Sequence, residues 1–160
     1  MNSVEELEVR DRLVFLRVDF NVPLTEAGEI RDDTRIRASL PTIRYLLDKG
    51  ARLIVASHLG RPKGKKDPKL SLAPVAKRLG GLVPNKVIMA PDVVGDDVAR
   101  LKRGLGAGEI LLLENVRYYR EEEANEPGFS KQLAEDVEVF VNDAFGSSHR
   151  AHASVVGIAD

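Results

Sequence analysis

Five short runs of apolar residues recur along the chain, and each is rich in branched aliphatic residues. They cover residues 13–18, 53–56, 87–90, 110–113 and 137–141. Most of these runs are continuous rather than alternating in polarity, which is typical of strands that are buried on both faces. The pattern therefore predicts five strands of a largely parallel sheet.

Helical periodicity fills the segments between these runs. The first segment places four apolar residues on one helix face: Ile36, Leu40, Ile43 and Leu47. Either Asp33 or Thr34 would cap the start of this helix, and Gly50 is placed to end it. Pro41 lies inside the pattern, and because proline has no N–H group it predicts a helix that bends or begins late.

Three further helices are predicted in the same way. Ser71 is positioned to cap the first of them, which the glycine pair 80–81 would stop. Asp96 would cap the second, and the third would begin at about Pro127. Their inward-facing residues would be Leu72, Val75, Ala76 and Leu79 in the first, Val98 and Leu101 in the second, and Phe129 and Leu133 in the third.

The order of these elements indicates the fold class. Strands alternate with helices about every 30 residues, which is the spacing that repeated βαβ units need. The chain has 160 residues, of which 43% are hydrophobic and 31% are charged, so one domain with its own core is expected. We predict an α/β domain, a Rossmann-like three-layer sandwich with a mostly parallel sheet and helices on both faces.

Composition and charge exclude several classes of function. The chain has no cysteine, which excludes disulfides, thiolate zinc sites and cysteine nucleophiles. Its unbroken apolar runs are far shorter than the roughly 20 residues of a membrane helix, and its first residues show no signal-peptide pattern. A net charge of −1 argues against non-specific nucleic-acid binding. We therefore expect a cytoplasmic protein whose partners include neither nucleic acid nor a membrane.

Candidate chemistry follows four of the five predicted strands. Arginine, histidine, acidic and amide residues follow the first, second, fourth and fifth runs, in segments 17–21, 57–64, 114–117 and 142–152. The segment after the third run, which begins with Pro91 and Asp92, is poor in such residues. Ligands of open α/β sheets bind beyond the carboxyl ends of the strands, so we expect these four segments to form a site at one edge.

Arginine is the most frequent charged residue at this expected edge. It supplies 15 of the 24 basic residues of the chain, and four arginines lie at or near the ends of four different strands: Arg17, Arg61, Arg117 and Arg150. Because the planar guanidinium matches phosphate and carboxylate oxygens, the pattern predicts a pocket for a small, multiply anionic ligand. A solvated charged rim is the alternative. Asp19 and Asn21 would be out of place in a purely cationic pocket, and they indicate a ligand that also carries a hydroxyl group.

Three motifs that suggest other sites do not meet the full requirements. Residues 60–66 resemble a phosphate-binding P-loop, but one residue is missing between the glycines, and Lys66 stands where Ser or Thr should hold magnesium. Residues 104–108 resemble part of a dinucleotide fingerprint, but they precede a strand instead of following one. His149 and His152 have a spacing possible for a metal, without an evident third ligand. We therefore expect this chain to bind neither a metal nor a cofactor.

Six segments together resemble the N-terminal part of phosphoglycerate kinases. They are 16–24 (LRVDFNVPL), 32–36 (DDTRI), 57–64 (SHLGRPKG), 114–117 (ENVR), 141–146 (VNDAFG) and 149–152 (HRAH). They occur in the order in which the family has them, and together they span most of the chain. Any one segment carries little information, whereas six in order are specific to this family.

The resemblance implies that residues 1–160 form the N-terminal, 3-phosphoglycerate-binding domain of a two-domain enzyme. The C-terminal domain, which binds Mg-ADP or Mg-ATP in the family, is absent from this chain and would be its partner. The implied reaction of glycolysis transfers a phosphoryl group between 1,3-bisphosphoglycerate and ADP, in a parent enzyme that is a monomer. Without the nucleotide-binding domain, the chain would bind 3-phosphoglycerate or 1,3-bisphosphoglycerate but would not turn it over.

The resemblance also implies a role for each motif residue. Asp19 and Asn21 would contact the glycerate part of the substrate, with Phe20 between them as a further substrate-binding residue. Arg35 would be the catalytic residue that stabilises the transferred phosphoryl group. The phosphate end of the substrate would be bound by His58, Leu59, Gly60, Arg61, Arg117 and Arg150, with Arg17 and His149 in support.

Two other functions fit the same fold. One is a non-enzymatic anion-binding or scaffold domain, because folds of this class host many functions. The other is a generic sugar-phosphate enzyme, which would need a general base in the pocket. Asp19 and His58 are the strongest candidates for that base, although the resemblance assigns both to binding.

Overall fold

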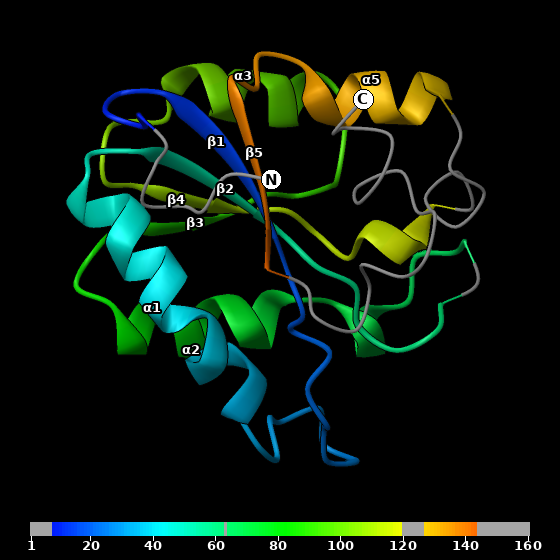
Figure 1. Cartoon of the computed structure of the whole chain (residues 1–160). Coiled ribbons are helices and arrows are strands. Elements are labelled where there is room, and N and C mark those ends of the chain that lie inside the picture. Colours follow the sequence, from blue (N-terminus) through cyan, green and yellow to red (C-terminus); the bar gives the residue numbers. More distant parts are fainter. Residues whose placement is uncertain (1–7, 63, 120–126, 144–160) are drawn as a thin grey trace.

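A parallel sheet forms the centre of the molecule (Figure 1). The computed structural model describes residues 8–62, 64–119 and 127–143, and within these ranges five strands pair in the order β3-β4-β2-β1-β5. The strands are β1 (Leu13–Val18), β2 (Arg52–Ala56), β3 (Val87–Met89), β4 (Ile110–Leu112) and β5 (Val139–Asp143). The five predicted strands are confirmed, and their ends differ from the predicted ones by at most two residues.

Helices cover both faces of this sheet (Figure 1). On one face lie α1 (Thr34–Asp48) and α2 (Ala73–Leu82). On the other face lie α3 (Asp96–Gly104) and α5 (Pro127–Ala134). The predicted three-layer α/β sandwich is therefore confirmed, with a sheet that is parallel throughout the described residues.

Two hydrophobic cores lie on the two faces of the sheet. Successive residues of a strand point to opposite faces, so Leu16 of β1 packs in the core of α1 and α2, while Phe15 packs in the core of α3 and α5. The helices contribute Ile36, Leu40, Ile43, Leu47, Val75 and Leu79 to the first core and Val98, Phe129 and Leu133 to the second. Because both faces are covered, the strands are apolar without alternation.

The start of α1 differs in detail from the prediction. Asp33 occupies the N-cap position, but its side chain makes no capping hydrogen bond. It accepts instead from the side chains of Arg37 and Arg78, at 3.0 and 2.7 Å. The N–H group of Thr34 donates to Oδ1 of Asp32 at 2.8 Å, so Asp32 satisfies the first donor of the helix.

Two expected helix breakers lie inside helices. The late start expected from Pro41 is wrong, because α1 begins before it and buries Ile36 and Leu40, which stabilises the turns ahead of the proline. The stop expected at the glycine pair 80–81 is also wrong, because α2 continues to Leu82. Leu82 packs against the first core, and this packing offsets the cost of about 1 kcal/mol for each helical glycine.

The caps of α2 and α3 are each displaced by one residue from the predicted position. Leu72 and Gly95 occupy the two N-cap positions. Oγ of Ser71 nevertheless accepts the N–H of Ala73 at 3.1 Å, so it still satisfies a donor of the first turn. Asp96 is the first residue of α3, where its negative charge faces the positive end of the helix dipole.

Candidate functional site

The strands that carry the polar segments are neighbours in the sheet. They are β4, β2, β1 and β5, while β3, whose end is poor in such residues, lies at the margin. Leu16 pairs with Val55 of β2 and with Val141 of β5, so the carboxyl ends of these three strands are aligned. Residues 19–21 and 57–60 leave the sheet at this edge, and we call it the strand-end edge.

Arg35 joins the first turn of α1 to the segment that follows β1. Its Nη1 donates to the carbonyl oxygen of Asn21 at 2.7 Å and lies 3.4 Å from Oδ1 of Asp19. The same oxygen of Asp19 accepts the N–H of Asn21 at 3.1 Å, which folds this segment back on itself. The Arg35 side chain is 52% exposed, so its guanidinium is anchored through Nη1 and still accessible to solvent.

An open depression of about 570 Å³ lies beside this cluster. It is lined by Asn21, Val22, Pro23, Asp32, Thr34 and Arg35. Its volume is in the usual range for a small-molecule site. The Arg35 guanidinium, the Asp32 carboxylate and the Asn21 amide border the same space, so a ligand there meets both a cation and hydrogen-bond acceptors.

Two polar side chains hold the loop after β2 against the segment after β1. Oγ of Ser57 accepts the N–H of Phe20 at 2.8 Å and donates to the carbonyl oxygen of His58 at 2.9 Å. Oδ1 of Asn21 accepts the N–H of Gly60 at 2.9 Å. Asn21 therefore binds the loop through its side chain and the helix-borne arginine through its backbone.

Gly60 occupies a position in this loop that favours glycine. Its φ of +62° lies in the left-handed region. A Cβ atom there would lie 2.7 Å from Cδ2 of Leu70, the last residue of the 3-10 turn η2 (Pro68–Leu70). The loop therefore packs its backbone directly on a leucine side chain.

Asn115 ties three segments of the site together, and it is 0% exposed. It follows β4 and precedes the 3-10 turn η3 (Val116–Tyr118). Its Oδ1 accepts the N–H groups of Leu59 and Arg117 at 3.3 and 3.1 Å. Its Nδ2 donates to the carbonyl oxygens of Leu59 and Leu70 at 2.7 and 2.9 Å. One amide thus fixes the loop after β2, the end of η2 and the backbone of Arg117.

Glu114 connects the same region to α2. Its Oε1 accepts the N–H groups of Leu72 and Asn115 at 2.9 and 2.8 Å. Its Oε2 accepts the hydroxyl of Ser71 at 2.7 Å. The carboxylate therefore binds donors at the start of α2 and is a structural acceptor.

Burial differs among the expected site residues, of which Asp19, Asn21 and Gly60 are half-buried. The side chains of Phe20 and Leu59 are 0% and 2% exposed and belong to the first core, so only their backbones lie at the strand-end edge. Arg17, His58 and Arg117 are also buried, at 0%, 7% and 5% exposure. Arg35 and Arg61 are exposed, and Arg150 and His149 lie outside the described residues.

Two titratable groups near this edge are shifted by burial. Tyr118 of η3 donates its hydroxyl to the carbonyl oxygen of Asp67 at 2.5 Å. Burial, with a smaller effect of the nearby Glu114 charge, raises the pKa of Tyr118 to about 12. Burial also raises the pKa of Asp143 at the end of β5, against a hydrogen bond with Thr42 that lowers it.

Sites of other kinds are not found in the described part of the chain. It contains no group of three or more His, Asp or Glu side chains able to hold a metal ion. None of its helices is both long enough and apolar enough to span a bilayer. The segment that resembles a P-loop leads into η2 rather than into an α-helix, which agrees with its rejection as a nucleotide site.

Comparison with known families decides which family this chain represents. The family model described as phosphoglycerate kinase matches residues 4–160. The chain belongs to the phosphoglycerate kinase family. Phosphoglycerate kinase of Coprothermobacter proteolyticus is 56% identical over 158 residues, which cover 99% of this chain and 40% of that relative. Cytosolic phosphoglycerate kinase of Triticum aestivum is 54% identical over 158 residues, or 99% of this chain and 39% of the relative.

Solved structures of the family share the fold. The phosphoglycerate kinase structure from Pyrococcus horikoshii OT3 matches with a TM-score of 0.88 and 33% identity, over 99% of this chain and 40% of that one. The structure from Coxiella burnetii matches with a TM-score of 0.83 and 36% identity, over 98% of this chain and 38% of that one. The chain therefore spans about two fifths of the length of the phosphoglycerate kinases that it matches.

Sequence reasoning missed three residues that hold the loops of this chain in place. No individual role is predicted for Ser57, Glu114 and Asn115, although all three lie in segments that resemble the family, SHLGRPKG and ENVR. Their side chains bind backbone groups of other segments, and such partners are not visible in a sequence. The available signal was a polar residue placed directly after a buried apolar strand.

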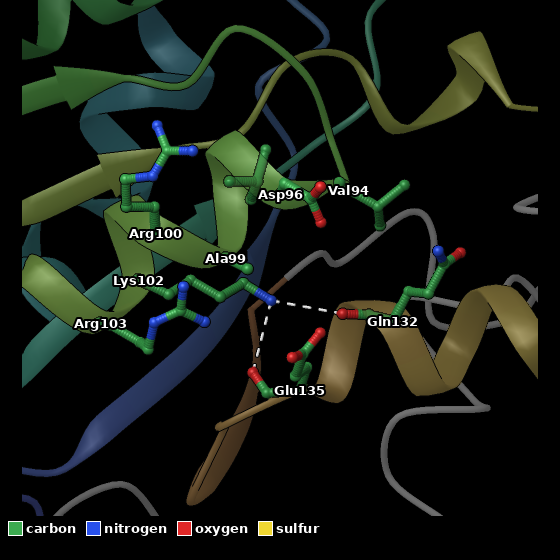
Figure 2. A pocket seen from close by; sticks show the side chains of 10 residues that line it. Val94, Asp96, Ala99, Arg100, Lys102, Arg103, Gln132 and Glu135 are labelled. Atoms are coloured by element: carbon green, nitrogen blue, oxygen red, sulfur yellow. Dashed lines mark hydrogen bonds between the residues drawn. The ribbon is translucent and has the colours of Figure 1, made fainter.

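A second cavity, of about 390 Å³, lies between α3 and α5 (Figure 2). The polar residues that line it are Asp96, Arg100, Lys102, Arg103, Gln132 and Glu135. Lys102 is 2% exposed, and its Nζ donates to the carbonyl oxygens of Gln132, Leu133 and Glu135 at 3.4, 3.1 and 3.5 Å. Burial lowers the pKa of Lys102, while the charges of Glu135 and Asp136 oppose that shift. This ammonium satisfies carbonyl groups at the end of α5, so its role is structural.

Proposed function

We propose that residues 1–160 are the domain of a phosphoglycerate kinase that binds 3-phosphoglycerate and 1,3-bisphosphoglycerate. The observation that carries the proposal is the arrangement at the strand-end edge, where Arg35 and the loop 57–60 are both bound to Asn21. This edge combines permanent positive charge with carboxylate and amide acceptors. A ligand that has both phosphate groups and a hydroxyl group requires that combination.

The glycerate part of the substrate would lie against Asp19 and Asn21. A carboxylate only accepts hydrogen bonds, so the ligand group that binds Asp19 has to donate, as the hydroxyl of glycerate does. Asp19 is partly exposed and is held in place by the N–H of Asn21. We assign Phe20 to this segment through its backbone, because its side chain is in the core.

The phosphate end of the substrate would lie against His58, Arg61 and Arg117, beside the backbone of Leu59 and Gly60. The backbone of Arg117 and the loop are bound to the same side chain, that of Asn115, so their relative position is fixed before a ligand arrives. Such preorganisation lowers the entropy cost of binding. Arg150 and His149 are assigned to this end from the resemblance of their motif.

Arg35 would stabilise the phosphoryl group that is transferred. In the proposed reaction the bond between that group and the acyl oxygen of 1,3-bisphosphoglycerate breaks, and a bond to a terminal oxygen of ADP forms. Such transfers depend on in-line positioning and on neutralising the charge of the moving group. Arg35 suits the second task, because its charge is permanent and its guanidinium is anchored but accessible.

The nucleotide would be supplied by the other domain of the parent enzyme. We propose that Mg-ADP or Mg-ATP binds to a C-terminal domain outside residues 1–160, and that closure of the two domains brings the substrates together. The chain alone would then bind its substrate without turnover. We also propose a monomeric parent enzyme in the cytoplasm, in line with the wheat relative that is named cytosolic.

Calorimetric titration with 3-phosphoglycerate tests the binding proposal. We expect a Kd of about 1 mM or tighter. The variant Arg117→Met keeps the apolar stem but removes charge-assisted hydrogen bonds worth about 1.5–3 kcal/mol, so its Kd should rise by roughly tenfold or more. Arg100→Ala is the matched control, because Arg100 is an exposed arginine of α3 away from the edge, and its Kd should not change. Absence of binding at tens of millimolar would contradict the proposal.

Complementation tests the catalytic proposal. The chain should restore phosphoglycerate kinase activity when it is mixed with a separately produced C-terminal half. Arg35→Ala should abolish that activity while the variant still binds 3-phosphoglycerate. Binding of the ligand without any restored activity would instead favour the non-enzymatic anion-binding or scaffold domain.

A further inference from the structure

Arg17 is a charged side chain that is buried in the interior of the protein. It belongs to β1, is 0% exposed and pairs with Ala56 of β2. His58 follows Ala56 by two residues, and residues two apart along an extended segment point to the same side. Nη2 of Arg17 lies 3.2 Å from Nδ1 of His58, which is hydrogen-bond distance.

The chemistry of the two groups decides which atom carries the proton. A guanidinium has five N–H donors, no acceptor, and a proton that it does not lose in proteins. Nδ1 of His58 therefore accepts this hydrogen bond through its lone pair. An imidazole ring whose Nδ1 is an acceptor carries its proton on Nε2, because the neutral ring has one donor and one acceptor nitrogen.

We propose that Arg17 is a positioning residue that holds His58 in the tautomer protonated at Nε2. Arg17 then acts through the ring instead of touching a ligand, which its burial supports. His58 meets a ligand as a neutral hydrogen-bond donor. The part of this inference that concerns the ligand rests on the proposed function.

This assignment determines which ligand atoms can bind to His58. Nε2–H matches an oxygen that only accepts, such as that of a phosphate or carboxylate, and it does not match a donor group of a ligand. The ring is also unsuited to remove a proton from a ligand through Nε2, since that nitrogen already holds one. His58 therefore serves binding of an anion and not general-base catalysis.

Nitrogen NMR of the ligand-free 160-residue chain tests the tautomer directly. The chain is labelled with ¹⁵N in histidine and arginine, so that a coupling between their nitrogens can be seen. At about pH 8 an ordinary imidazole is neutral, so the two ring nitrogens report the tautomer. We expect Nδ1 of His58 at an unprotonated position, Nε2 at a protonated one, and a scalar coupling across the hydrogen bond from Arg17. The spectrum of a His58→Gln variant identifies the ring. A protonated Nδ1 would overturn the proposal.

Two variants of Arg17 test its positioning role. Arg17→Met removes the donor and keeps much of the apolar stem, so the ring should populate both tautomers. Arg17→Lys retains a positively charged donor and should restore the tautomer protonated at Nε2. The same tautomer population in all three proteins would overturn the role of Arg17. If neither variant folds, the scalar coupling and the ring chemical shifts of the unmodified chain decide whether Arg17 donates to Nδ1 of His58.

A titration with 3-phosphoglycerate in the same spectra separates this inference from the proposed function. We expect the Nε2–H resonance to move as the ligand saturates, while Nδ1 stays unprotonated. If the ligand moves no resonance, the proposed function fails and the Arg17–His58 assignment stands. If the ligand binds and Nδ1 becomes protonated, His58 is a charged donor and the inference fails while the proposed function stands.

Discussion

Replacement of Asn115 by alanine removes four hydrogen bonds at one buried point of the site. A typical internal hydrogen bond contributes about 1 kcal/mol net, which gives about 4 kcal/mol for the set. The cavity left by the amide is polar, and water that enters it recovers part of the loss. We therefore expect the free energy of unfolding to fall by about 3 kcal/mol, which corresponds to about 6–12 °C in Tm for a domain of this size.

Urea unfolding followed by circular dichroism measures this change. Asn85→Ala is the matched control, because Asn85 makes one hydrogen bond to a backbone carbonyl, that of Gly108 at 2.9 Å, away from the strand-end edge. The control should lose about 1 kcal/mol. An Asn115→Ala variant that loses no more than the control would refute the view that this amide holds three segments together.

The same variant should also bind 3-phosphoglycerate more weakly under conditions where it is folded. Without Asn115, the loop that contains Leu59 and the turn that contains Arg117 are no longer tied to one another. We expect Kd to rise several-fold in calorimetry at low temperature, where circular dichroism shows the variant to be folded. An unchanged Kd would show that Asn115 stabilises the fold without positioning the site.

Three further predictions concern single side chains. Tyr118→Phe should lose about 1 kcal/mol of unfolding free energy near neutral pH. Because burial raises the pKa of Tyr118 from 10.0 to about 12, its contribution is complete below pH 10 and is lost as the pH rises from 10 to 12. The difference in unfolding free energy between the unmodified chain and Tyr118→Phe should therefore disappear over that range in urea titrations, and an unchanged difference would contradict the raised pKa. The pKa of Lys102 is lowered from 10.5 in the folded chain, so the unfolded state binds the proton more tightly. The stability of the unmodified chain relative to Lys102→Met should therefore rise as the pH increases toward 10.5. A difference in stability that does not change with pH would contradict the lowered pKa. Gly60→Ala should weaken 3-phosphoglycerate binding and destabilise the fold. In the control Gly28→Ala, at φ +82°, no atom lies within 4 Å of the added Cβ, so this variant should cost only the backbone strain of about 1–2 kcal/mol. Equal Kd values for both variants would show that the loop geometry does not matter for binding.

Continuous apolar runs were sufficient to predict the sheet, because strands buried on both faces need apolar residues throughout. The displacement of β5 shows the limit of this signal. Val137 was placed in the strand, but its N–H donates to the carbonyl oxygen of Ala134 at 3.0 Å, and Asp136 has φ of +66°. The turn after α5 therefore uses Val137, and an apolar residue in a turn looks the same in a sequence as one in a strand.

The meeting of the candidate segments at one edge of the sheet was also predictable, whereas the contacts among them were not. Asp19, Asn21 and His58 follow strands whose carboxyl ends share one edge, and that rule depends only on the order of the elements. Arg17 was expected as a supporting member of the basic patch, and the structure buries it against the ring of His58. The contacts of Lys102 could not be predicted, because its partners are backbone carbonyls at the end of a helix far along the chain.

Chemical-shift mapping with 3-phosphoglycerate tests the central claim most directly, because it reports both binding and its location in the 160-residue chain. We expect the largest shifts in the backbone amides of residues 19–21, 58–60 and Arg117, which surround the strand-end edge. The amides around Lys102 in the cavity between α3 and α5 should not move. Shifts confined to that second cavity, or no shifts at tens of millimolar ligand, would contradict a substrate site at the strand-end edge.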